Sequence, residues 1–213
     1  MWLEKIIYIY NKTKMNIKFD EITFPHKIIV KIVEPTSTVL DLGCGNGELL
    51  EYLITNKHVQ GYGIEIEEQS IYKCIERGIS VFHLNLDSGL SDYNDKSFDY
   101  VILDQTLQEV KNPDKVLHDA LRVGSHVIVS FPNFAHYKAR WQLAIMGKAP
   151  IAPALPFEWY NTPNLHFLSL YDFVNYCKTK KITIEQNFFI SKNKLIKISP
   201  NFRAQIGIFV IKK

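Results

Sequence analysis

The sequence predicts an α/β fold, a three-layer Rossmann-like sandwich around a mostly parallel sheet. From Val39 onward, short apolar segments typical of strands alternate with segments of helical period, which is typical of parallel sheets covered by helices on both faces. A glycine-rich turn, GCGNG at residues 43–47, joins the first strand to the first helix, as in sheets of this class. The chain of 213 residues is long enough to bury one such core without disulfides or metals.

The strands are predicted from short apolar runs bounded by turn residues. The first run, TVLDLG, is followed by VQGYGIEI, ISVFHLNL and SFDYVILD. A fifth run, HVIVSFPN, and two closing runs, ITIEQNFFIS and QIGIFVIKK, bring the sheet to seven strands. No helix is predicted between the third and fourth runs, so the segment between Asp87 and Phe98 is expected to be a loop.

The helices are predicted from one-sided apolar spacing and from capping residues. ELLEYLIT, directly after the glycine turn, places its apolar residues on one face, and EQSIYKCIERG follows the second strand. NPDKVLHDALRVG has Asn112 at the N-cap, Pro113 in the first position and a glycine after its end. Residues 135–147 are also predicted to be helical, and SLYDFVNYCKTK opens with a capping box of Ser169 and Asp172.

The beginning of the chain falls outside this alternation. The chain is therefore divided into an N-terminal extension, residues 1–34, and one domain, residues 35–213. The extension is expected to be either a helical lid or an over-long start, with Met15 as a candidate first residue. Its opening segment is not interpreted as a signal peptide, because Glu4 interrupts the apolar patch and no cleavage-like site follows.

Composition and charge exclude several classes of protein. The net charge of +3 is too small, and the basic residues are too evenly spread, to predict a nucleic-acid partner. No apolar stretch approaches the roughly 18 residues of a membrane span, so no membrane partner is expected. The odd set of cysteines, Cys44, Cys74 and Cys177, fits neither a zinc pattern nor a disulfide framework. We therefore expect no metal and a reducing, cytoplasmic location.

The glycine turn has an acid on either side. Its G-x-G-x-G spacing differs from that of dinucleotide-binding turns, and Asp41 before it would sit badly beside a pyrophosphate, which disfavours an NAD-type dehydrogenase. Glu65 ends the second strand, where a carboxylate can accept two hydrogen bonds from a ribose diol. The pattern suits an amino acid joined to a nucleoside, such as S-adenosylmethionine. Taken alone, Asp41 could also be a structural carboxylate and Cys44 a small turn residue.

With these residues in place, the chain resembles the class I S-adenosylmethionine-dependent methyltransferases over about residues 35–213. The resemblance implies a seven-stranded sheet with an antiparallel C-terminal strand, and S-adenosylmethionine or S-adenosylhomocysteine as the cofactor. Asn85 or Asp87 would meet the adenine amine, and Leu86 would cover the adenine face. The cofactor-binding residues that the resemblance implies are Asp41, Gly43, Cys44, Gly45, Glu65, Ile66, Asn85, Leu86, Asp87 and Gln105.

Three later segments resemble one family more closely. They are LDQTLQEVKNPDKVLHDALRVG, SFPNFAHYKARWQLAIMGKAP and LPFEWYNTPNLHFLSLYDF, and they look like the MetW family of methionine biosynthesis proteins. This resemblance implies a partner role, because MetW proteins bind homoserine O-acyltransferase, of the acetyl or succinyl type, and support its activity. The cofactor site could then sense S-adenosylmethionine, which derives from the end product of that pathway.

No catalytic residue is assigned from the sequence. The [DN]PP[YFW] motif of many nucleobase and amide methylases is absent after the fourth strand, where the chain reads LDQT. Asp104 in that segment could lie in the cleft or cap the turn. An active methyltransferase acting on a small molecule is the alternative to the partner role. Other titratable candidates near the cleft mouth are His136, Tyr137, Glu158, Tyr160 and His166.

The aromatic stretch PFEWYNTPNLHF has three interpretations: core packing under a loop, a partner-binding patch, or a lid over a substrate. Tryptophan and tyrosine are frequent interface anchors, which supports the second interpretation. The neighbouring segment HYKARWQ, with Arg140 and Trp141, could belong to the same surface.

Overall fold

The computed structural model describes Phe19 and residues 22–213. The predicted helices and strands are all present, although β3 and α6 are shorter than expected. The first half of the chain contains α2 (Phe24–Ile32), β1 (Thr38–Leu42), α3 (Glu48–Lys57), β2 (Gln60–Glu65), α4 (Glu68–Glu76), β3 (Ser80–His83), the 3₁₀ turn η1 (Leu86–Ser88) and β4 (Phe98–Asp104). The second half contains α5 (Pro113–Val123), β5 (Gly124–Pro132), α6 (Tyr137–Ala144), α7 (Leu170–Lys180), β6 (Thr183–Ser191), β7 (Lys194–Leu195), α8 (Pro200–Arg203) and β8 (Ile206–Lys212).

The strands form one mixed sheet in the order β3-β2-β1-β4-β5-β8-β6-β7. The pairs among β1 to β5 are parallel, and β8 runs antiparallel to both β5 and β6, which confirms the predicted antiparallel C-terminal strand. The sheet has 8 strands rather than the predicted seven, because β7 pairs with the end of β6. With only two residues, β7 is too short for its sequence to have a strand period.

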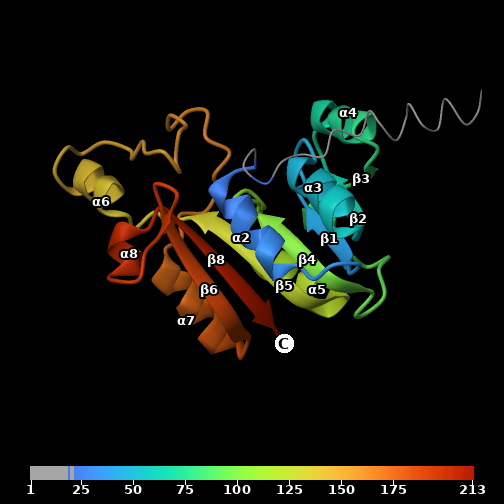
Figure 1. Cartoon of the computed structure of the whole chain (residues 1–213). Helices are drawn as coiled ribbons and strands as arrows, with labels where there is room; N and C mark the ends of the chain where they lie inside the picture. The colour runs from blue at the N-terminus through green and yellow to red at the C-terminus, as the bar shows by residue number, and fades with distance from the viewer. Residues whose placement is uncertain (1–18, 20–21) are drawn as a thin grey trace, which may run out of the picture.

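Helices cover both faces of the sheet (Figure 1). Successive side chains of a strand point to opposite faces, and β4 illustrates this: Ile102 packs in the same cluster as residues of α2 and α3. Its neighbours Val101 and Leu103 pack in a second cluster with residues of α5 and α7. Burial of both faces explains why the central strands β1, β4 and β5 are almost continuously apolar, since neither face of the sheet meets water at these strands.

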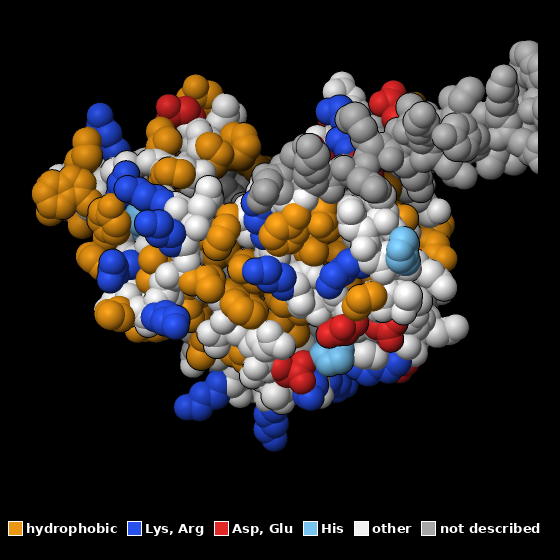
Figure 2. All heavy atoms as spheres, viewed as in Figure 1, with side chains coloured by type: hydrophobic (Ala, Val, Ile, Leu, Met, Phe, Trp, Pro, Cys, Tyr) orange, Lys and Arg blue, Asp and Glu red, His pale blue; other side chains and the backbone are white. Residues whose placement is uncertain are grey.

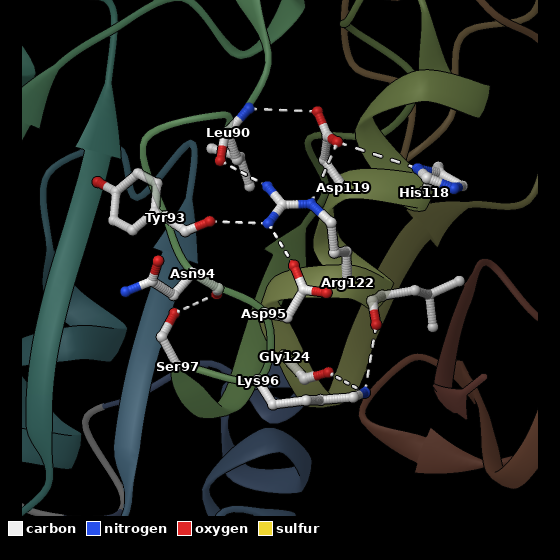
Figure 3. Close-up of polar contacts among 11 residues, drawn as sticks. Leu90, Tyr93, Asn94, Asp95, Lys96, Ser97, His118, Asp119, Arg122 and Gly124 are labelled. Atoms are coloured by element: carbon white, nitrogen blue, oxygen red, sulfur yellow. Dashed lines mark hydrogen bonds and ion pairs between the residues drawn. The ribbon is translucent and has the colours of Figure 1, made fainter.

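The β3–β4 loop replaces a crossover helix, as the sequence predicts, and Arg122 of α5 closes it (Figure 3). The Arg122 guanidinium donates to the carbonyl oxygens of Leu90 and Tyr93, each at 2.7 Å, and pairs with Asp95 at 2.8 Å. The Lys96 ammonium donates to the Gly124 carbonyl at 2.7 Å. Charged donors thus hold the loop to the end of α5. Arg122 of α5 donates to carbonyls of the loop, and Lys96 of the loop donates to the carbonyl of Gly124.

The predicted capping signals hold at α7 and in part at α5. Ser169 Oγ accepts the Asp172 amide at 3.2 Å, and the Asp172 carboxylate accepts the Ser169 amide at 2.9 Å, which is the predicted capping box. Pro113 opens α5 as predicted, but the Asn112 side chain makes no capping bond in the described structure. The Asp87 carboxylate instead accepts the amide of Asn112 itself at 2.9 Å, which holds the start of α5 to η1.

The predicted N-terminal extension contributes one described helix, α2, which begins after the N-cap residue Thr23. Met15, the candidate first residue, lies outside the described residues, and the division between residues 34 and 35 stays a prediction. Within the described part of the chain, no helix is long and apolar enough to cross a membrane.

Candidate functional site

The glycine turn after β1 has a backbone that only glycine adopts easily. Gly43, Gly45 and Gly47 have φ values of +76°, +52° and +78°. A Cβ atom on Gly43 would come within 2.7 Å of Thr106, so this position needs glycine for close packing as well. A Cβ atom on Gly45 would meet nothing within 4 Å, because this glycine faces open space. The turn therefore presents bare backbone to a cavity, as the sequence suggested.

Glu65 is anchored at the carboxyl end of β2. Its Oε2 atom accepts the Gly45 amide at 2.8 Å, and Oε1 accepts the amides of Ile66 at 2.7 Å and Glu67 at 3.0 Å. These three bonds fix the carboxylate across the gap between the glycine turn and the start of α4. A carboxylate offers about four acceptor directions, so Oε2 keeps the capacity to accept from a ligand.

Asp41 is a buried acid whose hydrogen bonding is incomplete. Its side chain is 2% exposed, and Oδ1 has no hydrogen-bond partner among the described residues. The pKa of Asp41 is raised to about 8, mainly by burial and then by the nearby charge of Asp104, while His26 opposes the shift. Leaving a buried polar atom unpaired costs roughly 1–3 kcal/mol, so this oxygen needs an explanation. A cationic donor in the adjoining cavity would provide one.

Two neighbouring cavities meet at the glycine turn. The smaller, of about 190 Å³, is lined by Asp41, Cys44 and Glu48 among others, which makes its wall acidic. The larger, of about 480 Å³, lies over the carboxyl ends of the central strands and shares Gly43, Gly45 and Asp104 with the smaller one. The predicted residues that line the larger cavity are Gly43, Gly45, Glu65, Ile66, Asn85, Leu86, Asp87 and Gln105. All ten predicted residues therefore line one cavity or the other, while their role in binding stays a prediction.

The structure bears on the open choice between Asn85 and Asp87. Both line the larger cavity, but Asp87 uses its two carboxylate oxygens for the amides of Lys111 and Asn112, at 3.1 and 2.9 Å. Asn85 Oδ1 accepts the Asp87 amide at 2.9 Å, which leaves its amide NH₂ group available as a donor. Because the adenine amine is a donor and both side chains keep acceptor capacity, the choice between Asn85 and Asp87 stays open.

His26 of α2 is a site residue that the sequence analysis missed. Its Nε2 atom lies 2.9 Å from Asp104 Oδ2, and Ser130 Oγ donates to the other oxygen of Asp104. Burial lowers the pKa of His26, but the hydrogen bond and charge of Asp104 outweigh it, so the net shift is upward. Asp104 does lie in the cleft, as one interpretation held. The sequence did contain a signal for the start of α2, because Thr23 is a typical N-cap residue and Pro25 is typical of the first helical turn.

The other titratable candidates do not line either cavity. His136 is buried, and its Nδ1 atom accepts the Lys138 amide at 3.4 Å, which caps α6. His166 Nε2 lies 3.0 Å from the Val110 carbonyl oxygen. Both histidines thus have structural roles. The side chains of Tyr137, Glu158 and Tyr160 are exposed to solvent, and they border neither cavity.

All three cysteines lie in the part of the chain that the structure describes. Cys44, Cys74 and Cys177 are free thiols, and the Cys44 and Cys74 sulfurs lie 3.8 Å apart beside the glycine turn. Burial raises the pKa of Cys44 and of Cys74, which keeps both as unreactive thiols. Within residues 22–213 and Phe19, no group of three or more histidines, cysteines and acids is placed to hold a metal.

One further residue of the larger cavity comes from a distant segment. Leu165 lies between β5 and α7, in residues 133–169, which we call the aromatic lobe. The amides of Leu165 and His166 donate to the Gln108 carbonyl at 2.8 and 3.1 Å. The end of the aromatic lobe is thus bonded to the loop that forms one wall of the cavity.

The chain matches the family model described as methionine biosynthesis protein MetW over residues 24–211. A curated relative, the bifunctional methionine biosynthesis protein MetXA/MetW of Rhodopirellula baltica, is 36% identical over 182 residues. These cover 81% of this chain and 29% of the relative, so the chain spans less than a third of that protein's length.

Solved structures agree on the fold. An S-adenosylmethionine-dependent methyltransferase from Mesorhizobium loti superposes with a TM-score of 0.65 at 17% identity, covering 92% of this chain and 100% of that one. Another from Archaeoglobus fulgidus has a TM-score of 0.64 at 18% identity, covering 97% and 99%. Identities this low concern the fold alone, and the predicted class I methyltransferase fold is confirmed.

Proposed function

Because this chain belongs to the MetW family of methionine biosynthesis proteins, we propose that it binds a homoserine O-acyltransferase and supports the activity of that enzyme. The relative from Rhodopirellula baltica supports this partner, since its name joins a MetXA part to a MetW part in one chain. We take the MetXA part as the acyltransferase. Two functions that are fused in one organism are often performed by associated chains in another, and this chain carries the MetW part.

We further propose that the two cavities bind S-adenosylmethionine or S-adenosylhomocysteine. The observation that carries this proposal is the unpartnered Oδ1 atom of Asp41, which suits the ammonium group of such a ligand. Glu65, already oriented by three amides, would accept from the ribose hydroxyls. S-adenosylmethionine, when bound, supplies a positively charged amino-acid end and a methyl group on a sulfonium.

The remaining predicted residues would complete this site. Asn85 or Asp87 would accept from the adenine amine and Leu86 would cover the adenine face, as their positions on the larger cavity allow. Gly43 and Gly45 would let the amino-acid end approach the backbone closely. The other residues that we assign to the site are Cys44, Ile66, Asp87 and Gln105.

We propose that this site senses the supply of S-adenosylmethionine and adjusts the support given to the acyltransferase. The hydrogen bonds from Leu165 and His166 to Gln108 connect the cavity wall to the exposed aromatic lobe. A ligand that orders this wall would thereby change the lobe as well, and such coupling between two sites is reciprocal. We place the protein in the cytoplasm, because its free buried thiols suit a reducing compartment.

The test of the partner role is co-expression with the homoserine O-acyltransferase of the same organism. We expect the two chains to co-purify and the acyltransferase rate to rise in the presence of this chain. Addition of saturating S-adenosylmethionine should then change that rate. An acyltransferase that neither co-purifies nor changes its rate would contradict the partner role, and an unchanged rate with ligand would contradict only the sensing role.

The second candidate function is methyl transfer to a small molecule, which the pairing of His26 and Asp104 favours. Held through Nε2, His26 is oriented to accept at Nδ1 the proton that a hydroxyl or amine acceptor must lose. The test is formation of S-adenosylhomocysteine by the isolated chain with a panel of small hydroxyl and amine acceptors. We expect a loss of at least about 100-fold in His26→Gln if this function holds.

A further inference from the structure

The aromatic lobe, residues 133–169, exposes more large apolar side chains than a folded surface normally leaves free (Figure 2). Trp159 is 74% exposed and Trp141 is 60% exposed, so neither packs in the core. Hydrophobic side chains gather over the part of the molecule that carries α6, with basic side chains between them (Figure 2). The exposed apolar side chains there also include Leu143, Ile145, Met146, Phe157, Tyr160 and Phe167.

The structure argues against one of the three interpretations of this stretch. Core packing is wrong for Trp159, because three-quarters of its side chain meets solvent. A lid over a substrate stays an untested interpretation, and Leu165 is the one residue of the aromatic lobe among the residues that line the two cofactor cavities. The tryptophan instead borders a separate hollow of about 440 Å³, together with Phe134, Leu143 and Phe157. The partner-binding interpretation remains as well.

The charge of the lobe indicates what kind of surface would fit it. Residues 133–169 contain Lys138, Arg140 and Lys148 but a single acid, Glu158. The Arg140 guanidinium lies 5.7 Å from the Phe202 ring centroid, so it forms part of the apolar surface as well. Tryptophan, tyrosine, methionine and arginine are the residues most enriched in protein interfaces. The matching partner surface would be apolar at its centre and acidic at its rim.

We propose that the aromatic lobe is the surface on which the homoserine O-acyltransferase docks. This inference rests on the partner role proposed above. The MetXA/MetW relative favours this occupant, since in that protein the MetXA part is tethered to the MetW part in one chain. Within the described part of the chain, the lobe combines exposed apolar side chains with basic ones between them (Figure 2), and it lies outside the cavity at the carboxyl ends of the strands except at Leu165.

The test measures the affinity of the acyltransferase for the full chain and for variants by calorimetry. We expect the double variant Trp141→Ala with Trp159→Ala to weaken binding at least about 30-fold, as for the central anchors of an interface. The matched control is Tyr72→Ala, since Tyr72 is 63% exposed on α4, which lies at the other end of the sheet (Figure 1). The control should bind within about 2-fold of the unmodified chain.

The outcomes separate the two proposals. Equal binding by the double variant and the unmodified chain would overturn the docking surface and leave the partner role standing. No binding by the unmodified chain would overturn both. Sedimentation of the chain alone adds a second measurement. If the double variant lost a self-association of the unmodified chain but still bound the acyltransferase equally well, the lobe would be a contact between copies of this chain. That result would overturn the inference. Thermal melting of each variant checks that the fold is intact.

Discussion

Two regions of this molecule depart from the ordinary rule of burial in opposite directions. At the glycine turn, Asp41 is an acid enclosed in the protein with one oxygen unpaired. In the aromatic lobe, Trp159 is a large apolar side chain left in solvent. Both arrangements are unfavourable for folding, because a buried polar atom loses hydrogen bonds to water and an exposed ring keeps apolar surface hydrated. We infer that each marks a place where a second molecule completes the contacts.

The β3–β4 loop is the useful contrast to both regions. It lacks regular structure like the aromatic lobe, and like the glycine turn it lies beside charged side chains. Arg122 donates to the loop carbonyls of Leu90 and Tyr93, and Lys96 of the loop donates to the Gly124 carbonyl, as Figure 3 shows. We infer that an irregular segment whose polar groups are hydrogen-bonded within the chain stabilises the fold, whereas one with unpaired polar groups or exposed apolar side chains indicates a binding site.

The largest expected effect concerns the pH dependence of stability at Asp41. Its pKa is raised to about 8 in the folded chain, against about 3.9 in an unfolded one. Between these values the unfolded chain has lost the proton and the folded chain retains it, so stability falls as pH rises from about 4 to 8. The unmodified chain should lose about 5 kcal/mol of stability over that window, and Asp41→Asn should abolish this pH dependence, measured by urea unfolding.

Saturating S-adenosylmethionine provides the control for this prediction. A bound ammonium group favours the ionised carboxylate, so the pH dependence of the unmodified chain should flatten with ligand present. Identical pH profiles for the unmodified chain and Asp41→Asn would indicate that Asp41 is a satisfied structural acid, and the contrast between the two regions would fail.

The next effect tests the contrasting loop. We expect Arg122→Ala to lower the free energy of unfolding by roughly 3 kcal/mol, because the carbonyls of Leu90 and Tyr93 lose their donor. Arg122→Lys keeps the charge but not the forked geometry, and should fall in between. Urea unfolding measures both variants. A loss below about 0.5 kcal/mol in Arg122→Ala would indicate that the loop does not depend on this closure.

Glu65 should affect ligand affinity by a smaller amount. We expect Glu65→Ala to weaken binding of S-adenosylmethionine by about 1.5–3 kcal/mol, the range for hydrogen bonds to a charged group. Calorimetry measures the affinity, and Glu68→Ala, on the exposed first turn of α4, is the matched control. If both variants bound the ligand as tightly as the unmodified chain, Glu65 would be an anchor of the turn and no part of the site.

The smallest effect is predicted for Trp159. Its side chain is exposed, so Trp159→Ala should change the free energy of unfolding by less than about 0.5 kcal/mol. The same urea experiment used for Arg122 provides the measurement. A loss of about 3 kcal/mol or more, the cost of removing a packed aromatic side chain, would mean that Trp159 supports the fold in solution.

Much of the fold and of the candidate site could be predicted from the sequence, because both depend on local patterns. Alternating apolar periods specify strands and helices, and the carboxyl ends of parallel strands meet at one edge of the sheet. The turn at residues 43–47, Glu65 at the end of β2 and Asn85 after β3 follow consecutive strands, so their proximity could be inferred without coordinates. The same argument did not extend to β7, whose pairing is too short to have a period.

Only the tertiary structure decided which residues far apart in the chain are in contact. His26 and Asp104 lie 78 positions apart, and no local pattern relates α2 to the end of β4. Nor could the sequence show that Asp87 accepts the amide of Asn112 at the start of α5, 25 positions away. A tryptophan such as Trp159 is equally at home in a core or at an interface. Its exposure depends on which elements of the fold cover it. Periodicity reports which face of an element is buried, whereas the partner that buries it, or leaves it open, is set by the packing of the whole chain.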